Sequence, residues 1–341
     1  MLSVAVALLA TATCMWAQPT EDERVEELLR KMTLQEKIGQ LNQLSVGGFD
    51  HNAAGMMRAG MVGSILNECN PNVLNRYQRA AVEESRLGIP LLISRDVIHG
   101  FKTMFPIPLG LAATFDPELV QQGARFAAIE ATASGIRWTF SPMLDIARDP
   151  RWGRGIETYG EDPYLTSRMG VMVAKGLQGP AGQPYDKLHA CAKHFAVHSG
   201  PEWNRHSFDA ENIEPRDLWE TYLPPFKALV QEANVEEVMC AYNRFEGQPC
   251  CGSDKLLLDI LRNEWGYDGI VVADCGAISD FYRRNAHQTH PSAVEASADA
   301  VAHGTDLDCG SSYRAIVKSV EQGLLDEAKL DETVRRLLKA R

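Results

Sequence analysis

The sequence predicts a parallel α/β fold, a single (β/α)8 barrel, from three observations. Short apolar segments alternate with helix-like segments seven or more times along the 341 residues, which is typical of strands joined by helices into a parallel sheet. The length suits eight such units in a barrel better than an open sheet. A dinucleotide-binding fold would need a G-x-G-x-x-G turn after an early strand, and the sequence contains none.

The first predicted element is an amphipathic helix that runs from Thr33 to about Leu44. It opens with a capping box, T-L-Q-E, in which the side chains of Thr33 and Glu36 satisfy backbone amides at the start of the helix. Apolar side chains then recur at helical spacing at Leu34, Ile38 and Leu41.

The apolar segments that follow are short and bounded by turn residues, as expected of strands buried on both faces. They cover residues 61–66, 89–94, 137–144, 188–194, 237–242, 269–274 and 304–308. Several intervening segments begin with Ser, Asp or Glu and with Pro in the first turn, which favours helices. These cover residues 71–86, 117–135, 163–177, 215–232, 253–265, 292–303, 312–322 and 330–341.

Composition excludes several classes of protein. Hydrophobic residues make up 45% of the chain and aromatic residues 8%, enough for a large core and unlike a disordered or fibrous protein. The 34 Lys and Arg are outnumbered by 45 Asp and Glu, so no basic field attracts nucleic acid or an anionic membrane. After residue 20 no apolar run approaches the ~18 residues of a spanning helix. We expect no nucleic-acid partner and no membrane span.

Residues 1–18 are interpreted as a signal peptide and residues 19–341 as one mature domain. The apolar run MLSVAVALLATATCMWA precedes an acidic stretch that starts at Glu21. The sequence therefore predicts an exported protein, periplasmic or extracellular. A buried N-terminal helix and a lipoprotein modified at Cys14 are the alternatives.

Seven cysteines lie beyond this segment, with no C-x-x-C pair, so no zinc site is predicted. Export permits disulfides, but the spacing does not determine their pairing. We expect most of these cysteines to be small buried packing residues.

Polar side chains gather where four predicted strands end, and the carboxyl ends of barrel strands form the active face. Asp96 follows one strand, Lys193 and His194 end the next, and Tyr242 and Asp274 follow two more. Taken singly, each has a structural explanation, such as a helix cap at Asp274 or an ion pair at Lys193. To gather these polar side chains on one face would cost free energy unless a polar ligand binds to them.

Residues 145–162 form a predicted loop that is dense in charged and aromatic side chains. Arg151, Arg154, Glu157 and Glu161 either pair across this loop or contribute to the polar face. The sequence contains no nucleophile elbow, phosphate loop or metal-binding motif. Carboxylates accompanied by Lys, Arg, His and Tyr suit sugar hydrolysis, in which one carboxylate attacks or stabilises the oxocarbenium-like centre.

Motifs along nearly the whole mature chain resemble glycoside hydrolase family 3. They are KMTLQEKIGQL (31–41), RDVIHG (95–100), FPIPLGLAATFD (105–116), DPRWGRGIETYGEDP (149–163), KHF (193–195), VMCAYN (238–243) and GIVVADCGAI (269–278). The resemblance implies the N-terminal barrel domain of a retaining exo-β-glycosidase that needs no metal or organic cofactor. By matching position it implies that Asp274 is the nucleophile. The residues it places around the terminal sugar are Asp96, Arg154, Lys193, His194 and Tyr242.

The resemblance leaves the general acid open. A retaining enzyme needs a second carboxyl about 5–5.5 Å from the nucleophile, and in most two-domain relatives it lies in a following α/β sandwich. We expect a fragment or a truncated gene that lacks this domain; a sugar-binding but nearly inactive barrel is the alternative. A β-N-acetylglucosaminidase, which uses an Asp-His pair, is a further alternative. His206 matches its histidine, but Asn204 stands in place of its aspartate.

The two halves of the chain resemble enzymes for different sugars. Up to about Arg154 the chain is similar to periplasmic β-glucosidases, whereas PEWNRHSFDAENI (201–213) and GTDLDCGSSY (304–313) look like β-xylosidases. Asp96 is one methylene shorter than the Glu typical of such xylosidases, which leaves room for the hydroxymethyl group of glucose. One methylene discriminates by only ~10- to 200-fold, so we expect terminal β-glucosyl residues, β-xylosyl residues or both as substrates.

Overall fold

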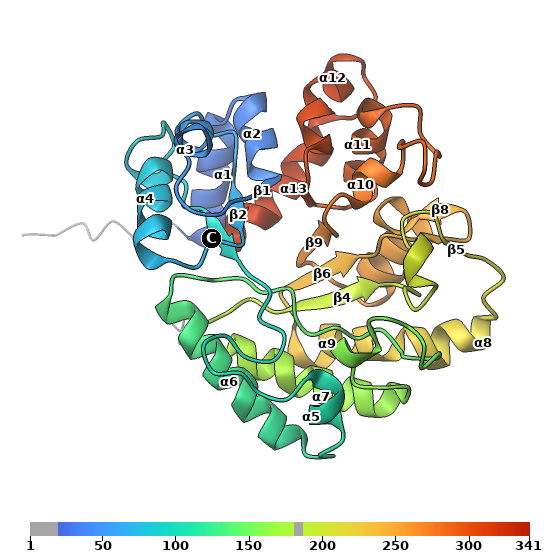
Figure 1. Ribbon diagram of the computed structural model, residues 1–341. Helices are drawn as coiled ribbons and strands as arrows, with labels where there is room; N and C mark the ends of the chain where they lie inside the picture. The colour runs from blue at the N-terminus through green and yellow to red at the C-terminus, as the bar shows by residue number, and fades with distance from the viewer. Residues whose placement is uncertain (1–19, 181–186) are drawn as a thin grey trace, which may run out of the picture.

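The computed structural model describes residues 20–180 and 187–341, and a curled parallel sheet forms its centre (Figure 1). The predicted signal peptide, residues 1–18, lies outside the described residues. The sheet has seven strands in the order β3-β2-β1-β10-β9-β6-β4, and all neighbours are parallel. The strands are β1 (Asn42–Ser45), β2 (Ser64–Leu66), β3 (Leu92–Ser94), β4 (Cys191–Phe195), β6 (Glu237–Cys240), β9 (Ile270–Ala273) and β10 (Leu307–Cys309). The predicted alternation of strands and helices is confirmed.

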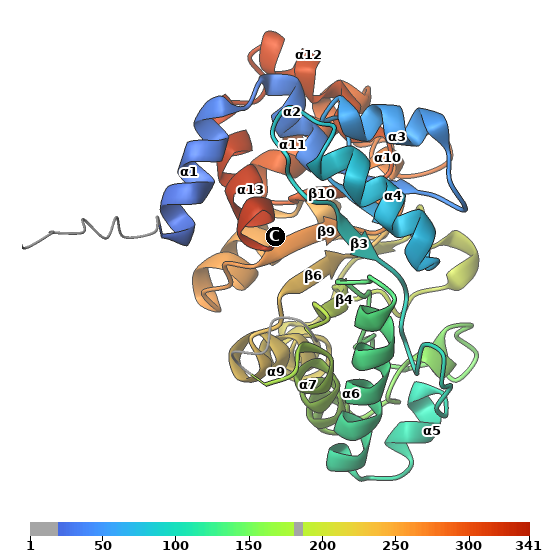
Figure 2. The ribbon, with the colours of Figure 1, turned by 90° about the vertical axis from the view of Figure 1, so that its left-hand side faces the viewer.

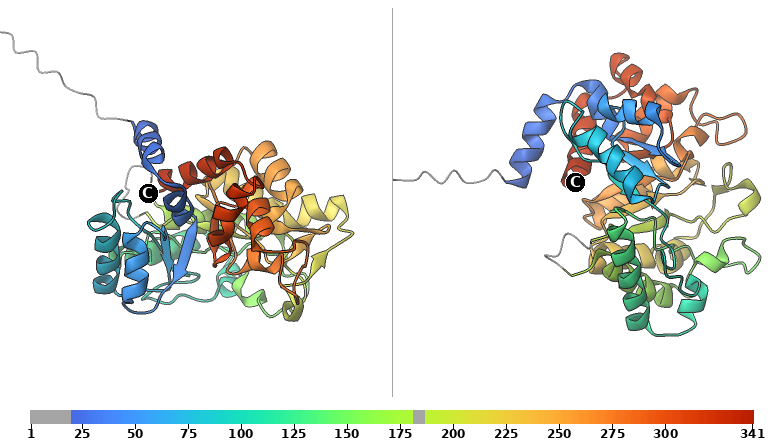
Figure 3. Two further views of the ribbon diagram at one scale, coloured as in Figure 1. Left: turned by 90° about the horizontal axis from the view of Figure 1, so that it is seen from above. Right: turned by 60° about the vertical axis from the view of Figure 1, so that its left-hand side comes forward.

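Helices cover the outside of the sheet, with α6, α7 and α9 on one side and α1, α4, α11 and α13 on the other (Figure 2). The helices are α1 (Glu21–Lys31), α2 (Leu34–Gln40), α3 (His51–Arg58), α4 (Pro71–Val82), α5 (Pro108–Ala112), α6 (Pro117–Ala133), α7 (Pro163–Gln178), α8 (Pro215–Asp217), α9 (Pro224–Ala233), α10 (Ala277–Asp280), α11 (Ala293–Ala302), α12 (Ile316–Glu321) and α13 (Glu327–Lys339). The first and last helices lie side by side (Figure 3), and Lys339 Nζ is 2.6 Å from a carboxylate oxygen of Asp22.

The prediction of a regular strand over residues 137–144 was wrong. Trp138 makes isolated parallel bridges to Ser94, which ends β3, and to His189, which precedes β4. This segment therefore connects the two edge strands of the sheet without forming a continuous ladder. Pro142 has no backbone N–H to donate, which prevents a regular strand at this position. The regular sheet has seven strands rather than the eight expected.

The first predicted helix is shorter than expected, because it ends at Gln40 and the next residues form β1. Its capping box is confirmed, since Thr33 and Glu36 each accept a hydrogen bond from the other's backbone amide. Gln43 pairs with Ser64 of β2, and Asn42 with Asp308 of β10. A strand that begins with two polar residues shows no apolar period, so pairing with distant strands decides its conformation.

Predicted helix 215–232 is divided into α8, a wide π-type turn over Leu218–Tyr222, and α9. Pro224 and Pro225 lack backbone amides, which interrupts the helical hydrogen bonds. The segment predicted as helix 253–265 is a π-type helix, Asp254–Glu264, capped by Ser253. A second, small sheet joins β5 (Asp209–Ala210), β7 (Arg244–Phe245) and β8 (Gln248–Pro249).

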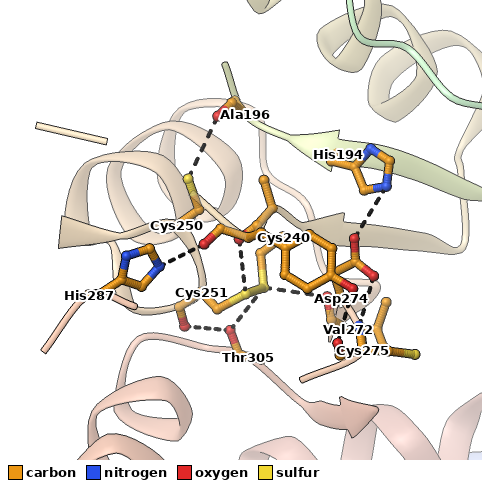
Figure 4. Close-up of a disulfide and its surroundings, with 12 residues drawn as sticks. His194, Ala196, Cys240, Cys250, Cys251, Val272, Asp274, Cys275, His287 and Thr305 are labelled. Carbon is orange, nitrogen blue, oxygen red and sulfur yellow. Dashed lines mark hydrogen bonds and ion pairs between the residues drawn. A yellow bond between two sulfur atoms is a disulfide. The ribbon is translucent and has the colours of Figure 1, made fainter. Parts of the chain in front are cut away.

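Two disulfides join chain segments at the carboxyl ends of the strands. Cys240 of β6 is bonded to Cys251 (Figure 4). Cys275, which follows β9, is bonded to Cys309 of β10. Cys191 and Cys250 are buried and free, and Cys69 is exposed. We expected most of the seven cysteines beyond the signal peptide to be buried packing residues. This was wrong, because four of them form disulfides. None of the helices in residues 20–180 and 187–341 is long and apolar enough to cross a membrane.

Candidate active site

All six residues predicted to form the site line one cavity of about 420 Å³. They are Asp96, Arg154, Lys193, His194, Tyr242 and Asp274. The cavity lies at the carboxyl ends of the strands, because five of these side chains lie within two residues of the end of β3, β4, β6 or β9. The ends of parallel strands meet at one edge of a sheet. The structure thus brings together side chains that are up to 178 residues apart in the sequence, from Asp96 to Asp274.

The Asp274 carboxylate is held at this edge with 13% of its side chain exposed. The backbone N–H of Cys275 donates to Oδ1 at 2.7 Å, and His194 Nε2 lies 3.3 Å from Oδ2 (Figure 4). The Tyr242 hydroxyl donates to the backbone oxygen of Cys275 at 3.0 Å. Burial and the nearby Asp274 carboxylate raise the pKa of Tyr242, so the phenol stays protonated.

His194 is buried and held by a carboxylate that the sequence analysis did not single out. Oδ2 of Asp145 lies 2.9 Å from Nδ1 of His194 and accepts its backbone N–H at 3.0 Å. Burial, together with the positive charge of Arg154, lowers the pKa of His194 well below its usual value. The imidazole is therefore neutral near pH 7, with Nδ1–H donating to Asp145 and Nε2 accepting from Arg154 at 3.3 Å.

Two cations balance the carboxylates of the cavity. Arg154 makes two hydrogen bonds to Glu157, of 2.8 and 2.9 Å, and Lys193 Nζ lies 3.4 Å from Oδ1 of Asp96. Burial alone would raise the pKa of Glu157, but Arg154 holds it below its usual value. Arg154 thus lies beside the Glu157 carboxylate, and Lys193 beside that of Asp96. Because the planar guanidinium of Arg154 binds one carboxylate through two of its nitrogens, its orientation is fixed.

Several residues that line the cavity or contact its lining were not predicted, because their partners are remote in sequence. Asp145 immediately follows the bridged segment 137–144, so a search of every strand end would have found it. Arg205 lines the cavity. Asn204 supplies no carboxylate to His206. Instead, Nδ1 of His206 lies 2.7 Å from Oδ2 of Asp280. Among the described residues, no cluster of three or more His, Cys, Asp or Glu could hold a metal ion.

Residues 33–340 match the model of the glycosyl hydrolase family 3 N-terminal domain. The chain belongs to glycoside hydrolase family 3. It is 48% identical over 302 residues to a xylan 1,4-β-xylosidase of Xylanibacter ruminicola, covering 80% of this chain and 35% of that protein. It is 37% identical over 321 residues to the periplasmic β-glucosidase of Salmonella typhimurium, covering 93% of this chain and 41% of that protein.

Solved structures agree with this family assignment. A β-glucosidase from Listeria innocua superposes with a TM-score of 0.86 at 37% identity, over 94% of this chain and 46% of that one. The chain thus spans less than half the length of these relatives. The resemblance deduced from the motifs is confirmed, and the relatives include both of the enzyme types that the sequence suggested.

Proposed function

We propose that this chain is the nucleophile-bearing part of a retaining exo-β-glycosidase. Its substrates would be non-reducing-end β-D-glucosyl residues, β-D-xylosyl residues, or both, in plant oligosaccharides. One observation carries the proposal: the Asp274 carboxylate shares a single cavity with Asp96, Arg154, Lys193, His194 and Tyr242. Carboxylates and cationic donors around one cavity suit the hydroxyl groups of a pyranose.

In the proposed reaction, an Asp274 oxygen forms a bond to the anomeric carbon while the bond to the leaving-group oxygen breaks. The leaving-group oxygen takes a proton from a general acid, and a glycosyl-enzyme remains. Water then attacks the same carbon, gives up a proton to the conjugate base of that acid, and releases Asp274. The hydrogen bond from Cys275 N–H orients the nucleophile, and Arg154 supplies positive charge beside it.

Asp96 and Lys193 would bind the hydroxyl groups at the far edge of the terminal sugar. The Asp96 side chain is 52% exposed and so accessible to a ligand, whereas Lys193, at 6%, is held rigidly behind it. The neutral imidazole of His194 would hold Arg154 in place through Nε2 without adding charge. Asp96 favours glucose by its length, and the 48% identity to a xylosidase favours xylose. The ratio of kcat/KM on p-nitrophenyl β-glucoside and β-xyloside decides between them.

We propose that residues 19–341 form a (β/α)8 barrel in which the bridged segment 137–144 takes the place of an eighth strand. The bridges from this segment to both edge strands, Trp138 to Ser94 of β3 and Met143 to Lys193 of β4, support this closure. We also propose that the protein is exported. This proposal is supported by the apolar run at residues 1–18 and by similarity to a periplasmic enzyme.

The general acid is proposed to come from a second domain. The chain spans 35% of the related xylosidase and 41% of the related β-glucosidase. Without an acid, the chain would be a sugar-binding but nearly inactive barrel. Rapid cleavage of cellobiose or xylobiose by this chain alone would exclude two hypotheses: a general acid supplied by a second domain, and a nearly inactive barrel.

The nucleophile assignment is tested with Asp274→Ala. Hydrolysis of a p-nitrophenyl glycoside, whose leaving group departs with little protonation, should be abolished. Addition of azide to this variant should restore turnover with inverted configuration, since the anion fills the space of the missing carboxylate. Unchanged turnover in the variant would remove the assignment. The matched control is Asp299→Ala, which removes a carboxylate that does not line the cavity.

A further inference from the structure

His198 is a buried histidine beside the cavity that no step of the proposed reaction uses. It follows β4 and does not itself line the cavity. Its ring centroid lies 4.7 Å from that of His194 and 6.2 Å from those of Tyr242 and Trp152. His194 and Tyr242 line the cavity, and Trp152 shares a loop with Arg154, which also lines it. The ring of His198 therefore packs against three chain segments that each carry a residue of the site.

A buried asparagine fixes His198 through a hydrogen bond. Nδ1 of His198 lies 3.1 Å from Oδ1 of Asn243, whose side chain is fully buried. The amide nitrogen of Asn243 donates to the backbone oxygens of Ala196, Val197 and Arg244. The oxygen of Asn243 is therefore the atom that faces the imidazole, and Nδ1 of His198 carries the hydrogen that it accepts.

These hydrogen bonds join the ends of two strands that carry site residues. Lys193 and His194 belong to β4, whereas Asn243 directly follows Tyr242, beyond the end of β6. The bond from His198 to Asn243 thus ties the chain that leaves β4 to the chain that leaves β6. We call this pair the His198–Asn243 clamp.

The backbone that the clamp holds is strained. Val197 has a φ of 57°, in the left-handed region that a β-branched residue rarely adopts. Such a conformation persists only where the surrounding contacts hold it, and strain of this kind is concentrated at functional sites. Asn243 supplies such contacts, because its amide nitrogen binds the oxygens of both Val197 and Ala196. The strained turn supports a role in the site in addition to packing of the core.

We propose that His198 is a positioning residue of the glycosidase, which holds His194 and Tyr242 in place around Asp274 through its hydrogen bond to Asn243. This inference rests on the proposed function and adds a residue that does not touch the substrate. His194 Nε2 lies 3.3 Å from Oδ2 of Asp274, so movement of the chain that leaves β4 changes the surroundings of the nucleophile directly. A misplacement of about 1 Å in a reacting site can reduce the rate about 100-fold.

The test replaces His198 in two ways that separate its hydrogen bond from its ring. His198→Phe keeps an aromatic ring but has no donor for Asn243. His198→Asn lacks the ring but carries an amide nitrogen on Cγ, where histidine carries Nδ1. On a p-nitrophenyl glycoside, His198→Phe should lower kcat about ten- to hundredfold with a smaller change in KM, because the geometry of the reacting groups is disturbed more than sugar binding. His198→Asn should recover most of this loss. Asn243→Ala removes the same hydrogen bond from the other side and should lower kcat as His198→Phe does.

Leu74→Ala is the control for a loss of stability alone, because Leu74 is buried in α4 and does not line the cavity. It should lower Tm and leave kcat unchanged at a temperature where circular dichroism shows every variant to be folded. Unchanged kcat in His198→Phe and Asn243→Ala, or an equal loss in both His198 variants, would overturn the positioning role, while turnover by the unmodified chain still supported the proposed function. Absence of turnover by the unmodified chain on both p-nitrophenyl β-glucoside and β-xyloside would overturn both.

Discussion

The disulfide between Cys275 and Cys309 is predicted to contribute substantially to stability. It closes a loop with a sequence separation of 34 residues, from the end of β9 to the end of β10. In the chain-entropy model, a loop of this length stabilises the folded state by about 4 kcal/mol. A domain of this size has an unfolding entropy of roughly 0.7 kcal/mol per K, so removal of the bond should lower Tm by about 5–6 °C.

The perturbation is the double variant Cys275→Ser/Cys309→Ser, followed by calorimetry and circular dichroism as the temperature is raised. Cys69→Ser is the matched control, because Cys69 is exposed and free, and its Tm should stay within about 1 °C of the unmodified chain. In dithiothreitol, the unmodified chain should lose at least as much stability as the double variant, since Cys240–Cys251 is reduced as well.

The same variant should also affect the site. Cys275 N–H holds Oδ1 of Asp274, and the Cys275 carbonyl accepts the hydrogen bond of Tyr242. Release of this residue should therefore lower kcat on a p-nitrophenyl glycoside as well as Tm. An oxidised double variant that melts within 1 °C of the unmodified chain would refute the loop-closure argument.

Three further predictions concern single side chains. Asp145→Asn should lower kcat/KM on a p-nitrophenyl glycoside by roughly 10- to 100-fold, because the buried His194 loses its carboxyl hydrogen-bond partner. Equal loss in control variants of the same Tm would contradict a specific role. Hydrogen bonding to Asp299 raises the pKa of His303 from 6.5 to about 9, so this pair stabilises the fold fully below pH 6.5 and loses its effect as pH rises through 9. The Tm difference between the unmodified chain and His303→Gln should shrink over that range, and a constant difference would argue against the ion pair. Asp96→Glu should shift the kcat/KM ratio toward xylosides by about tenfold, the typical effect of one methylene, and no shift would show that Asp96 does not set sugar preference.

Local features could be predicted from the sequence alone because their physical causes lie within a few residues. The capping box at Thr33 depends on a partner three residues away, and buried strands such as β9 are continuous apolar segments. The grouping of Asp96, Lys193, Tyr242 and Asp274 was also predictable, since strand ends meet at one edge in any parallel α/β fold. The motif resemblance added Arg154, which lies in a loop without periodicity.

Only the tertiary structure decided which distant residues meet. The Asp145–His194 contact spans 49 residues, and the His206–Asp280 contact spans 74, so neither leaves a pattern within one helix or strand. The pairing of Cys240 with Cys251 and of Cys275 with Cys309 depends on the fold, which brings their Cα atoms to 5.1 and 4.4 Å from each other. Strand β1 and the bridged segment 137–144 are set by neighbours in the sheet rather than by their own apolar residues, because backbone pairing outweighs weak local preference.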